Sequence, residues 1–430
     1  MKKIVIIGAG SFNFTRAISR DILTFPALAD SHIALVDIPE GAERMEASRA
    51  IIDKMIRQGG YAATVSATFD RRKALEGADA VIITIRNDIT IDAWSKDLTI
   101  PKKFGVDTVV GDTRGPSGIF RFLRSASEIL RICRDIEELA PGALVLNYTN
   151  PMNMICSYIG RLCRINLTGL CHSVQGTAAM LAGWIGAELS DVTYLCAGIN
   201  HQAYFLDYRW KGQDAYPLIR RAIEENPEIY DKERVRNEMF LHLGYYVTES
   251  SRHNSEYNPW FRKRQDLIDR YCPDTYGYSI RVITERDAER HEKMREILAQ
   301  PTVDLTRGRE YAASILNAVL GDGAMFEFNG NIPNDGYITN LPDRATVEVP
   351  IVASKAGLRA IRIGEMPRQL AVLNYANAQV EELAVEGCIE KDRRKIEYAI
   401  MNDPLTAAVC SLAEARELAR ELFAANDVGF

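Results

Sequence analysis

The chain has 430 residues, of which 47% are hydrophobic and 26% are charged, and its formal net charge is -6. A chain of this length can bury a large core, and usual domain sizes predict two lobes or one elaborated α/β unit. The mildly acidic balance gives no reason to propose a polyanion as a partner, so we expect neither nucleic acid nor an anionic membrane.

The N-terminal half alternates apolar strands with amphipathic helices. It opens on MKKIVIIGAG, whose apolar run is too short for a signal peptide and predicts a strand followed by a glycine turn. A helix, a strand over 31–38 and a second helix follow, which makes a βαβ unit. Apolar runs at 78–85, 142–150 and 165–171 predict further strands. The pattern indicates an α/β fold with a Rossmann-type, doubly wound parallel sheet.

The C-terminal half has a mixed pattern of helices and strands. We therefore predict a Rossmann domain over residues 1–200 and a mixed α+β domain over residues 201–430, with no linker to mark the boundary. The expected helices lie at 231–247, 283–300, 308–320 and 367–387, and the expected strands at 324–331 and 345–354.

The cysteines and the hydropathy pattern indicate in which cellular compartment we expect the protein. None of the eight cysteines belongs to a CxxC pair, and their wide spacing favours reduced thiols in the cytoplasm over a disulfide framework. We see no run of about 18 apolar residues of the kind that spans a membrane.

The first glycine turn predicts a dinucleotide site. The stretch GAGS places Gly8, Gly10 and Ser11 between a strand and a helix, where bare backbone can approach a pyrophosphate and helix N-terminal amides face its charge. Asp37 ends the second strand, where a carboxylate accepts hydrogen bonds from ribose hydroxyls and disfavours a 2′-phosphate. The third glycine of the fingerprint is absent, so an ordinary strand-to-helix turn is the alternative. The order of elements favours NAD binding by the first domain.

Three further polar side chains follow predicted strands and should meet at one edge of the sheet. Asn150 lies at the end of the run at 142–150, Cys171 ends the next strand, and His201 ends another. A thiolate and an imidazole can hold a divalent metal and leave positions open for substrate. The alternatives are a buried free cysteine with a satisfied histidine, a nucleophile pair made by Cys171 and His172, and a helix-capping role for Asn150.

These stretches together resemble a known family. GAGS, PGALVLNYTNP, GLCHSV and GINHQAYF, with GDTRGPSGIFR and NDGYITNLPDRATVEVP, are similar in order and position to glycoside hydrolase family 4, the NAD- and divalent-metal-dependent glycosidases. The similarity covers essentially the whole chain. The motif CHSV resembles the α-galactosidase (melibiase) subgroup. The resemblance implies a lactate/malate dehydrogenase-like NAD-binding domain and a substrate-binding, catalytic second domain.

The resemblance also implies a redox route to α-galactoside hydrolysis, in contrast to glycosidases that use two carboxylates. NAD would accept hydride from carbon 3 of the sugar, a base would remove the carbon 2 proton, and Mn²⁺ or another divalent metal would stabilise the enolate. The glycosidic oxygen would then leave, water would add, and the hydride would return with retention of configuration.

Carried over by position, the resemblance assigns roles to individual residues. Cys171 and His201 would bind Mn²⁺, Asn150 would hold sugar hydroxyls, and His172 takes the place of the acid, with a substrate-orienting role as its alternative.

The catalytic base is a departure from the family pattern, because Phe240 stands where a tyrosine is expected. Tyr245, Tyr246 and Tyr257 are nearby, and we favour Tyr257 because SSRHNSEYNPW is typical of a site-lining loop. Arg262 is a candidate contact for sugar hydroxyls, and a solvated surface arginine is its alternative.

Three other functions remain compatible with the sequence. An α-galacturonidase or α-glucuronidase of the same family should gather a cation near carbon 6 of the sugar. An NAD-dependent hydroxy-acid dehydrogenase would consume NAD and need no metal. A non-catalytic NAD sensor would bind the dinucleotide without turnover. The family also implies a homodimer or homotetramer.

Overall fold

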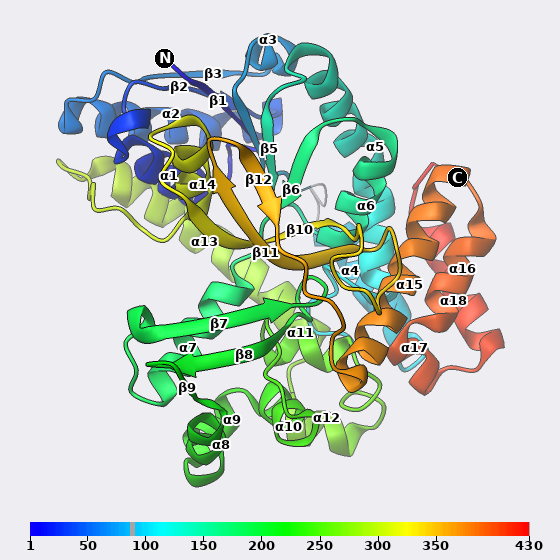
Figure 1. Ribbon diagram of the computed structural model, residues 1–430. Helices are drawn as coiled ribbons and strands as arrows, with labels where there is room; N and C mark the ends of the chain where they lie inside the picture. Colours follow the sequence, from blue (N-terminus) through cyan, green and yellow to red (C-terminus); the bar gives the residue numbers. More distant parts are fainter. Residues whose placement is uncertain (87–90, 430) are drawn as a thin grey trace.

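The computed structural model describes residues 1–86 and 91–429. A nine-stranded sheet lies at its centre in the order β12-β11-β10-β6-β5-β4-β1-β2-β3 (Figure 1). Strands β1 to β6 pair in parallel in the 3-2-1-4-5-6 order of a Rossmann fold, which confirms the predicted doubly wound sheet. The strands are β1 (Lys3–Ile7), β2 (His32–Val36), β3 (Thr64–Thr68), β4 (Ala80–Ile83), β5 (Leu144–Asn147), β6 (Asn166–Gly169), β10 (Phe326–Pro333), β11 (Thr346–Ser354) and β12 (Gly357–Ala360).

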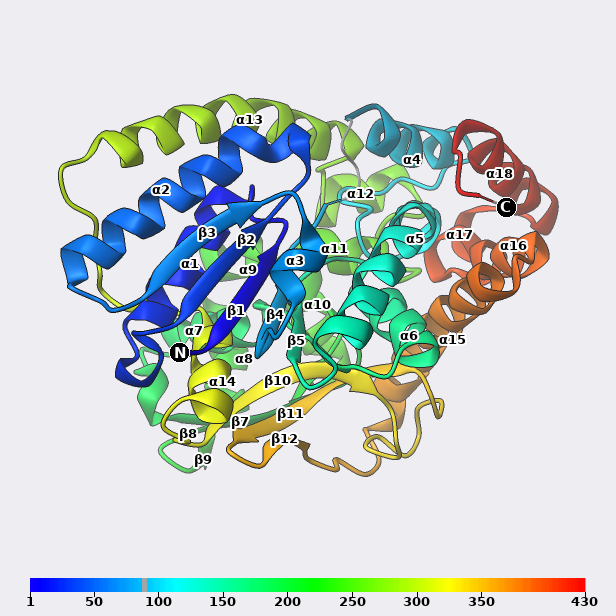
Figure 2. The same ribbon diagram turned by 90° about the horizontal axis from the view of Figure 1, so that it is seen from above.

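Helices cover both faces of this sheet (Figure 2). In β1, Ile4 and Ile6 pack into one core and Val5 and Ile7 into the other, which is why the strand is apolar throughout. The first core includes α1 (Phe12–Leu23), α2 (Ala42–Gly59) and α14 (Tyr311–Leu320), with α13 (Tyr276–Ala299) beside α2. The second includes α3 (Arg71–Leu75), α4 (Ile91–Lys103), α5 (Gly115–Leu139), α6 (Met152–Leu162), α15 (Arg368–Glu390), α16 (Arg393–Asn402), α17 (Pro404–Val409) and α18 (Leu412–Ala425).

A smaller antiparallel sheet with its own helices lies below the large one in Figure 1. Its apolar core contains Phe205, Tyr208 and Phe240, all of them buried. The elements are β7 (Val192–Ala197), β8 (Tyr204–Trp210), β9 (Gln213–Asp214), α7 (Ser173–Trp184), α8 (Tyr216–Glu225), α9 (Pro227–Lys232), α10 (Arg234–Leu243), α11 (Ser251–Glu256) and α12 (Gln265–Tyr271).

The chain returns from this region to the large sheet. Strand β10 adds to β6 in the antiparallel sense through Asn331 and Gly169, and β11 and β12 follow it. Residues of the predicted second domain therefore complete the sheet of the first, and the boundary at residue 200 stays a prediction. Among the described helices, none is both long and apolar enough to cross a bilayer.

Candidate active site

Three side chains form a compact cluster that could hold a metal ion. One ligand atom each from Cys171, His201 and Glu249 lies within 4.8 Å of the other two. The Nε2 atom of His201 is 3.6 Å from a carboxylate oxygen of Glu249. Sulfur, imidazole nitrogen and carboxylate oxygen are all donors to divalent first-row metals. We call these three residues the metal cluster.

The fold brings the metal cluster together from three segments. Cys171 lies two residues beyond β6. His201 lies four residues beyond β7, with a left-handed φ of 62°, rather than at the strand end that we predicted. Glu249, between α10 and α11, also has a left-handed φ of 62°. Such a conformation is uncommon for residues other than glycine and persists where surrounding contacts hold it, often at functional sites.

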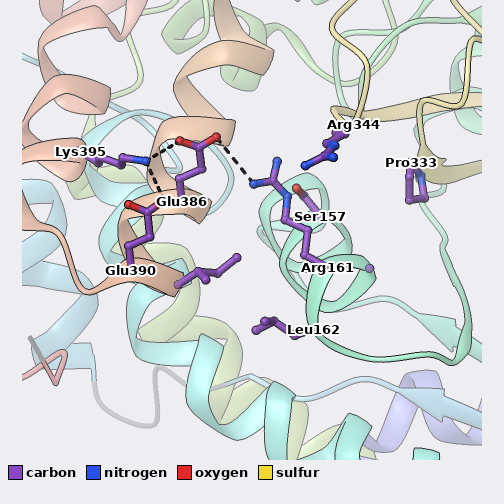
Figure 3. A pocket seen from close by; sticks show the side chains of 10 residues that line it. Ser157, Arg161, Leu162, Pro333, Arg344, Glu386, Glu390 and Lys395 are labelled. Atoms are coloured by element: carbon purple, nitrogen blue, oxygen red, sulfur yellow. Dashed lines mark hydrogen bonds and ion pairs between the residues drawn. The ribbon is translucent and has the colours of Figure 1, made fainter.

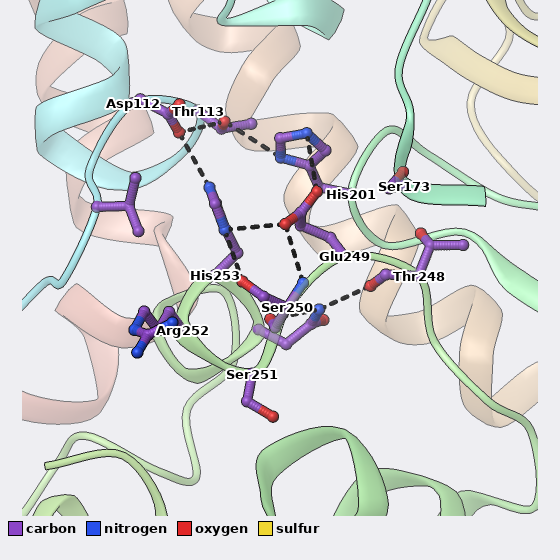
Figure 4. Close-up of polar contacts among 12 residues, drawn as sticks. Asp112, Thr113, Ser173, His201, Thr248, Glu249, Ser250, Ser251, Arg252 and His253 are labelled. Carbon is purple, nitrogen blue, oxygen red and sulfur yellow. Dashed lines mark hydrogen bonds and ion pairs between the residues drawn. The ribbon is translucent and has the colours of Figure 1, made fainter. Parts of the chain in front are cut away.

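Two charged side chains, His253 and then Asp112, lie in a row next to Glu249 (Figure 4). The ring of His253 lies between two carboxylates, with Nδ1 3.3 Å from Glu249 and Nε2 3.4 Å from Asp112. Burial opposes a charge on His253, but Glu249 and Asp112 together outweigh this effect and hold the pKa of His253 well above its usual value. Burial also opposes a charge on Glu249, yet His253 holds the pKa of that carboxyl well below its usual value. The cluster therefore contains an anionic carboxylate with a fixed direction.

The imidazole of His201 is held at its other nitrogen. Its Nδ1 atom lies 3.3 Å from Thr113 Oγ1 and 3.2 Å from the Tyr257 hydroxyl. Burial lowers the pKa of His201 to about 4, so the ring is neutral at pH 7, which is the form that binds metals. A ligand histidine is normally oriented in this way through its second nitrogen.

Arg114 ties the segment around His201 to the rest of the fold. It is buried, donates to the Asn200 carbonyl at 2.6 Å and to Glu381 at 2.9 Å, and its guanidinium lies 4.7 Å from the centre of the Tyr257 ring. The Glu381 carboxylate also accepts from Asn153 at 2.9 Å. A buried arginine thus fixes the backbone that presents His201.

Cys171 and His172 do not form a nucleophile pair in this structure. The sulfur of Cys171 contacts the Ser173 hydroxyl at 3.2 Å, and the His172 ring contacts Glu310 at 2.9 Å instead. Burial, followed by the charges of Glu348 and Glu249, raises the pKa of the Cys171 thiol. Metal binding would have to displace this proton, as is usual for a cysteine ligand.

Asn150 lies beside this region rather than at a helix cap. Helix α6 begins at Met152 and receives no side-chain cap bond, so the capping alternative is wrong. The Asn150 amide instead donates to Asp112 at 3.5 Å. Through Asp112 it is connected to His253 and the metal cluster.

The glycine turn has the shape expected of a dinucleotide site. Gly8 has φ +91°, and a Cβ there would lie 2.7 Å from the backbone of Thr84, so only glycine fits. The amide of Gly10 donates to Asp37, whose carboxylate reaches the turn from the end of β2. Ser11 precedes α1 and makes no side-chain cap bond. The turn lies between β1 and α1, and β1 lies between β2 and β4 at the point where the strand order reverses.

The candidate base Tyr257 and the candidate substrate contact Arg262 are both fully buried. Tyr257 contacts His201 and so belongs to the site, although SSRHNSEYNPW begins with helix α11 rather than a loop. Arg262 donates to the carbonyls of Asp107, Cys272 and Asp274 at 2.6, 2.9 and 2.8 Å. The structure therefore corrects our prediction for Arg262: each of its three nitrogens donates to a backbone carbonyl, so it joins segments of the chain instead of offering donors to a sugar. Its burial also excludes the alternative of a solvated surface arginine. Phe240 packs in the small core.

Several charged residues of the site escaped the sequence reasoning. Asp112 lies in GDTRGPSGIFR and His253 in SSRHNSEYNPW, both of which we had singled out without choosing these residues. Glu249 stands just before the second stretch. Glu348 lies on β11, is fully buried, and has no hydrogen-bond partner for either carboxylate oxygen within the described chain. Burial, with the charge of Glu249, raises its pKa to about 8.

A cavity of about 750 Å³ lies elsewhere, between α6, α15 and α16 (Figure 3). Its charged side chains largely pair with one another: Lys395 contacts Glu386 and Glu390 at 2.8 Å each, and Arg161 lies 3.8 Å from Glu386. The metal cluster does not line this cavity.

Comparison with known proteins places this geometry in context. Residues 3–187 match the model of the family 4 glycosyl hydrolases, and residues 196–406 match that of the family 4 glycosyl hydrolase C-terminal domain. An alpha-galactosidase of Rhizobium meliloti (strain 1021) is 35% identical over 99% of this chain and 88% of its own length. An alpha-galactosidase of Bacillus subtilis (strain 168) is 36% identical over 99% and 98%.

A solved structure supports the fold independently. A 6-phospho-alpha-glucosidase from gut microorganisms, solved in complex with NAD and Mn²⁺, superimposes with a TM-score of 0.83 over 99% of this chain and 98% of its own. Its sequence is 19% identical, so it bears on the fold alone.

Proposed function

The chain belongs to the family 4 glycosyl hydrolases and is a glycoside hydrolase, and on that premise we propose that it is an α-galactosidase that works with NAD and a divalent metal such as Mn²⁺. The observation that carries the proposal is the convergence of Cys171, His201 and Glu249 within 4.8 Å. We place this cluster beside an NAD site at the glycine turn. The proposal extends to a cytoplasmic enzyme, since its eight cysteines, Cys171 included, are free thiols.

The donor set fits a divalent metal. Cys171 offers a thiolate, His201 a neutral imidazole and Glu249 an anionic carboxylate that His253 holds in place. Three protein ligands leave coordination positions for substrate oxygens. When bound, the metal supplies Lewis acidity toward sugar oxygens and NAD supplies a reversible oxidant for carbon 3.

The glycine turn fits NAD for two reasons. Gly8 and Gly10 leave bare backbone where a pyrophosphate would approach. Larger residues do not fit there, because a Cβ would lie 2.7 Å from Thr84 at position 8 and 2.7 Å from Asp37 at position 10. The Phe12 amide donates to the Gly10 carbonyl, but the Ser11 side chain caps none of the amides that follow it in the first turn of α1, and these could meet phosphate oxygens. Asp37 would accept from the ribose hydroxyls.

The remaining residues would bind the sugar and move its protons. Asn150, next to Asp112, would donate to sugar hydroxyls, and His172 would meet the substrate from the start of α7. We retain Tyr257 as the base for the carbon 2 proton. Burial, followed by the charges of Asp112 and Glu256, raises its pKa, and the cation of Arg114 over its ring opposes this rise. The hydroxyl lies 3.2 Å from Nδ1 of His201, next to the metal cluster.

The charges around the cluster favour a neutral sugar over a uronide. Three carboxylates surround this region, and Arg114 is committed to Glu381 and to a backbone carbonyl. A uronate would bring a further negative charge into this field, which costs free energy in a desolvated site. The carboxylates are those of Asp112, Glu249 and Glu310.

One experiment tests the proposal. Purified enzyme, freed of NAD and metal and kept reduced, is assayed with 4-nitrophenyl α-galactoside and with the matching α-galacturonide, before and after NAD and Mn²⁺ are restored. We expect hydrolysis of the galactoside only after both are restored, with NAD needed in catalytic amounts. Unchanged hydrolysis without them would contradict the mechanism. Preference for the uronide would favour the α-galacturonidase alternative, and stoichiometric NADH formation from a hydroxy acid would favour a dehydrogenase.

A further inference from the structure

The side chain of Glu310 holds His172 in one orientation. Its carboxylate lies 2.9 Å from Nε2 of the imidazole. The ring of Tyr148 stacks on the imidazole at 5.6 Å with an interplanar angle of 20°, and Tyr311 and Phe14 meet it edge-on at 5.5 and 5.9 Å. An imidazole that is 50% exposed is thus held by an aromatic frame and one hydrogen bond.

The start of α14 holds both residues of the Cys171–His172 pair. Glu310 binds the His172 ring, and the hydroxyl of the next residue, Tyr311, donates to the Cys171 carbonyl at 2.7 Å. Glu310 stands at the N-cap position of α14 but makes no cap bond with its side chain, which leaves its carboxylate for His172.

Helix α1 fixes the position of Glu310 in turn. The buried carboxylate of Asp21 accepts from the amides of Gly308 and Glu310 at 2.8 and 3.1 Å. Helix α1 directly follows the glycine turn of the proposed NAD site. The same helix therefore anchors Glu310, the residue that orients His172.

We infer that Glu310 is a positioning residue for the glycosidase reaction: it holds His172 through Nε2 and leaves Nδ1 as the ring nitrogen that meets the substrate. Among the described residues, no hydrogen-bond partner of Nδ1 is found. A group held in its working orientation loses less entropy when it meets substrate. The expected effect on turnover rests on the proposed function, whereas the orientation of the His172 ring does not depend on that function.

The Glu310 carboxylate gives little to stability, which makes the test clean. The side chain of His172 is 50% exposed and that of Glu310 is 17% exposed, so solvent screens their interaction and its contribution to folding is small. We therefore expect Glu310→Ala to fold normally and to lower kcat/KM about 10- to 100-fold on an aryl α-galactoside, the usual effect of removing a residue that orients a functional group. Glu310→Gln should stay within a few-fold of the wild type, because its amide oxygen accepts the same hydrogen bond.

Two further variants separate positioning from general damage. In a His172→Ala background, Glu310→Ala should cause no additional loss, because the group that it orients is gone. The matched control is Glu238→Ala, which removes a carboxylate 3.5 Å from another exposed histidine, His242, and should leave kinetics unchanged. An additional loss in the His172→Ala background, or wild-type kinetics in Glu310→Ala, would overturn the inference.

Histidine ¹⁵N NMR tests the same inference without a measurement of turnover. We expect His172 to show the Nε2–H tautomer in the wild type and in Glu310→Gln, and a mixture of tautomers in Glu310→Ala. An unchanged His172 signal in Glu310→Ala would contradict the inference even if the protein proved to lack α-galactosidase activity. Normal NMR behaviour with an inactive wild type would instead refute the proposed function alone.

Discussion

Removing Arg114 should cost several kcal/mol of stability and displace the segment that carries His201. The arginine and its partner Glu381 are both buried, with side-chain exposures of 2% and 7%, and their charged atoms lie 2.9 Å apart. In Arg114→Met the carboxylate keeps only its bond from Asn153. Breaking one side of a buried ion pair typically costs about 3–5 kcal/mol, and we expect a loss in this range at pH 7.

The pH dependence of this loss provides a sharper check. Burial raises the pKa of Glu381 even with Arg114 present, and Arg114 opposes this rise, so the pKa should rise further in the variant. A carboxyl whose folded pKa exceeds its unfolded value destabilises the fold as the pH rises from the unfolded pKa toward the folded one. The deficit of Arg114→Met should therefore grow between about pH 4 and 7, by at most about 1.4 kcal/mol per pH unit for each carboxyl involved.

Urea unfolding of the wild type and Arg114→Met at several pH values measures both quantities. Glu381→Gln in the Arg114→Met background is the matched control, because it removes the unpaired charge and should recover part of the stability at pH 7. A loss below about 1 kcal/mol at pH 7, or a loss that does not shrink toward acid pH, would refute this reading of a buried ion pair.

Three further predictions concern the metal cluster and its neighbours. Glu249→Gln should weaken Mn²⁺ binding at least about 10-fold in calorimetric titration without changing the fold, and an unchanged affinity would remove Glu249 from the metal site. Tyr257→Phe should lower kcat by a factor of about 100 or more while KM changes little, and a kcat near that of the wild type would exclude it as the base. Arg262→Met should lower the free energy of unfolding by about 3 kcal/mol or more, because three buried carbonyls lose their donor. The folded fraction of this variant should keep the KM of the wild type. A raised KM with normal stability would restore the substrate role of Arg262.

The parts of the fold that the sequence predicted are those with a strong local pattern. Strands β1, β2 and β4 are apolar in nearly every position because helices cover both faces, and such runs stand out in the sequence. Strand β3 (Thr64–Thr68) is partly exposed and rich in threonine, and we did not predict it. The sequence pattern also did not predict that β10 joins the large sheet, because the pairing of Asn331 with Gly169 connects residues far apart in the chain.

The site shows the same division. Cys171 and His201 were predicted to meet because the carboxyl ends of neighbouring strands share one edge of a sheet. They do lie together, but His201 follows β7, a strand of the small antiparallel sheet, so the reason for the prediction was wrong. Glu249 joins them from a connection between two helices, through a left-handed backbone that no periodic pattern signals. Arg262 was misplaced because an arginine in a polar, aromatic stretch resembles a binding residue, and only the fold shows that its donors face three backbone carbonyls.

The proposed chemistry rests on the removal and return of the proton at carbon 2, and hydrolysis in D₂O measures it directly. Galactose released from 4-nitrophenyl α-galactoside by the holoenzyme is exchanged back into H₂O and analysed by mass spectrometry and proton NMR. We expect one non-exchangeable deuterium, located at carbon 2, in most of the product. Galactose with hydrogen retained at carbon 2 and deuterium absent from its other carbons would contradict proton abstraction beside the metal cluster.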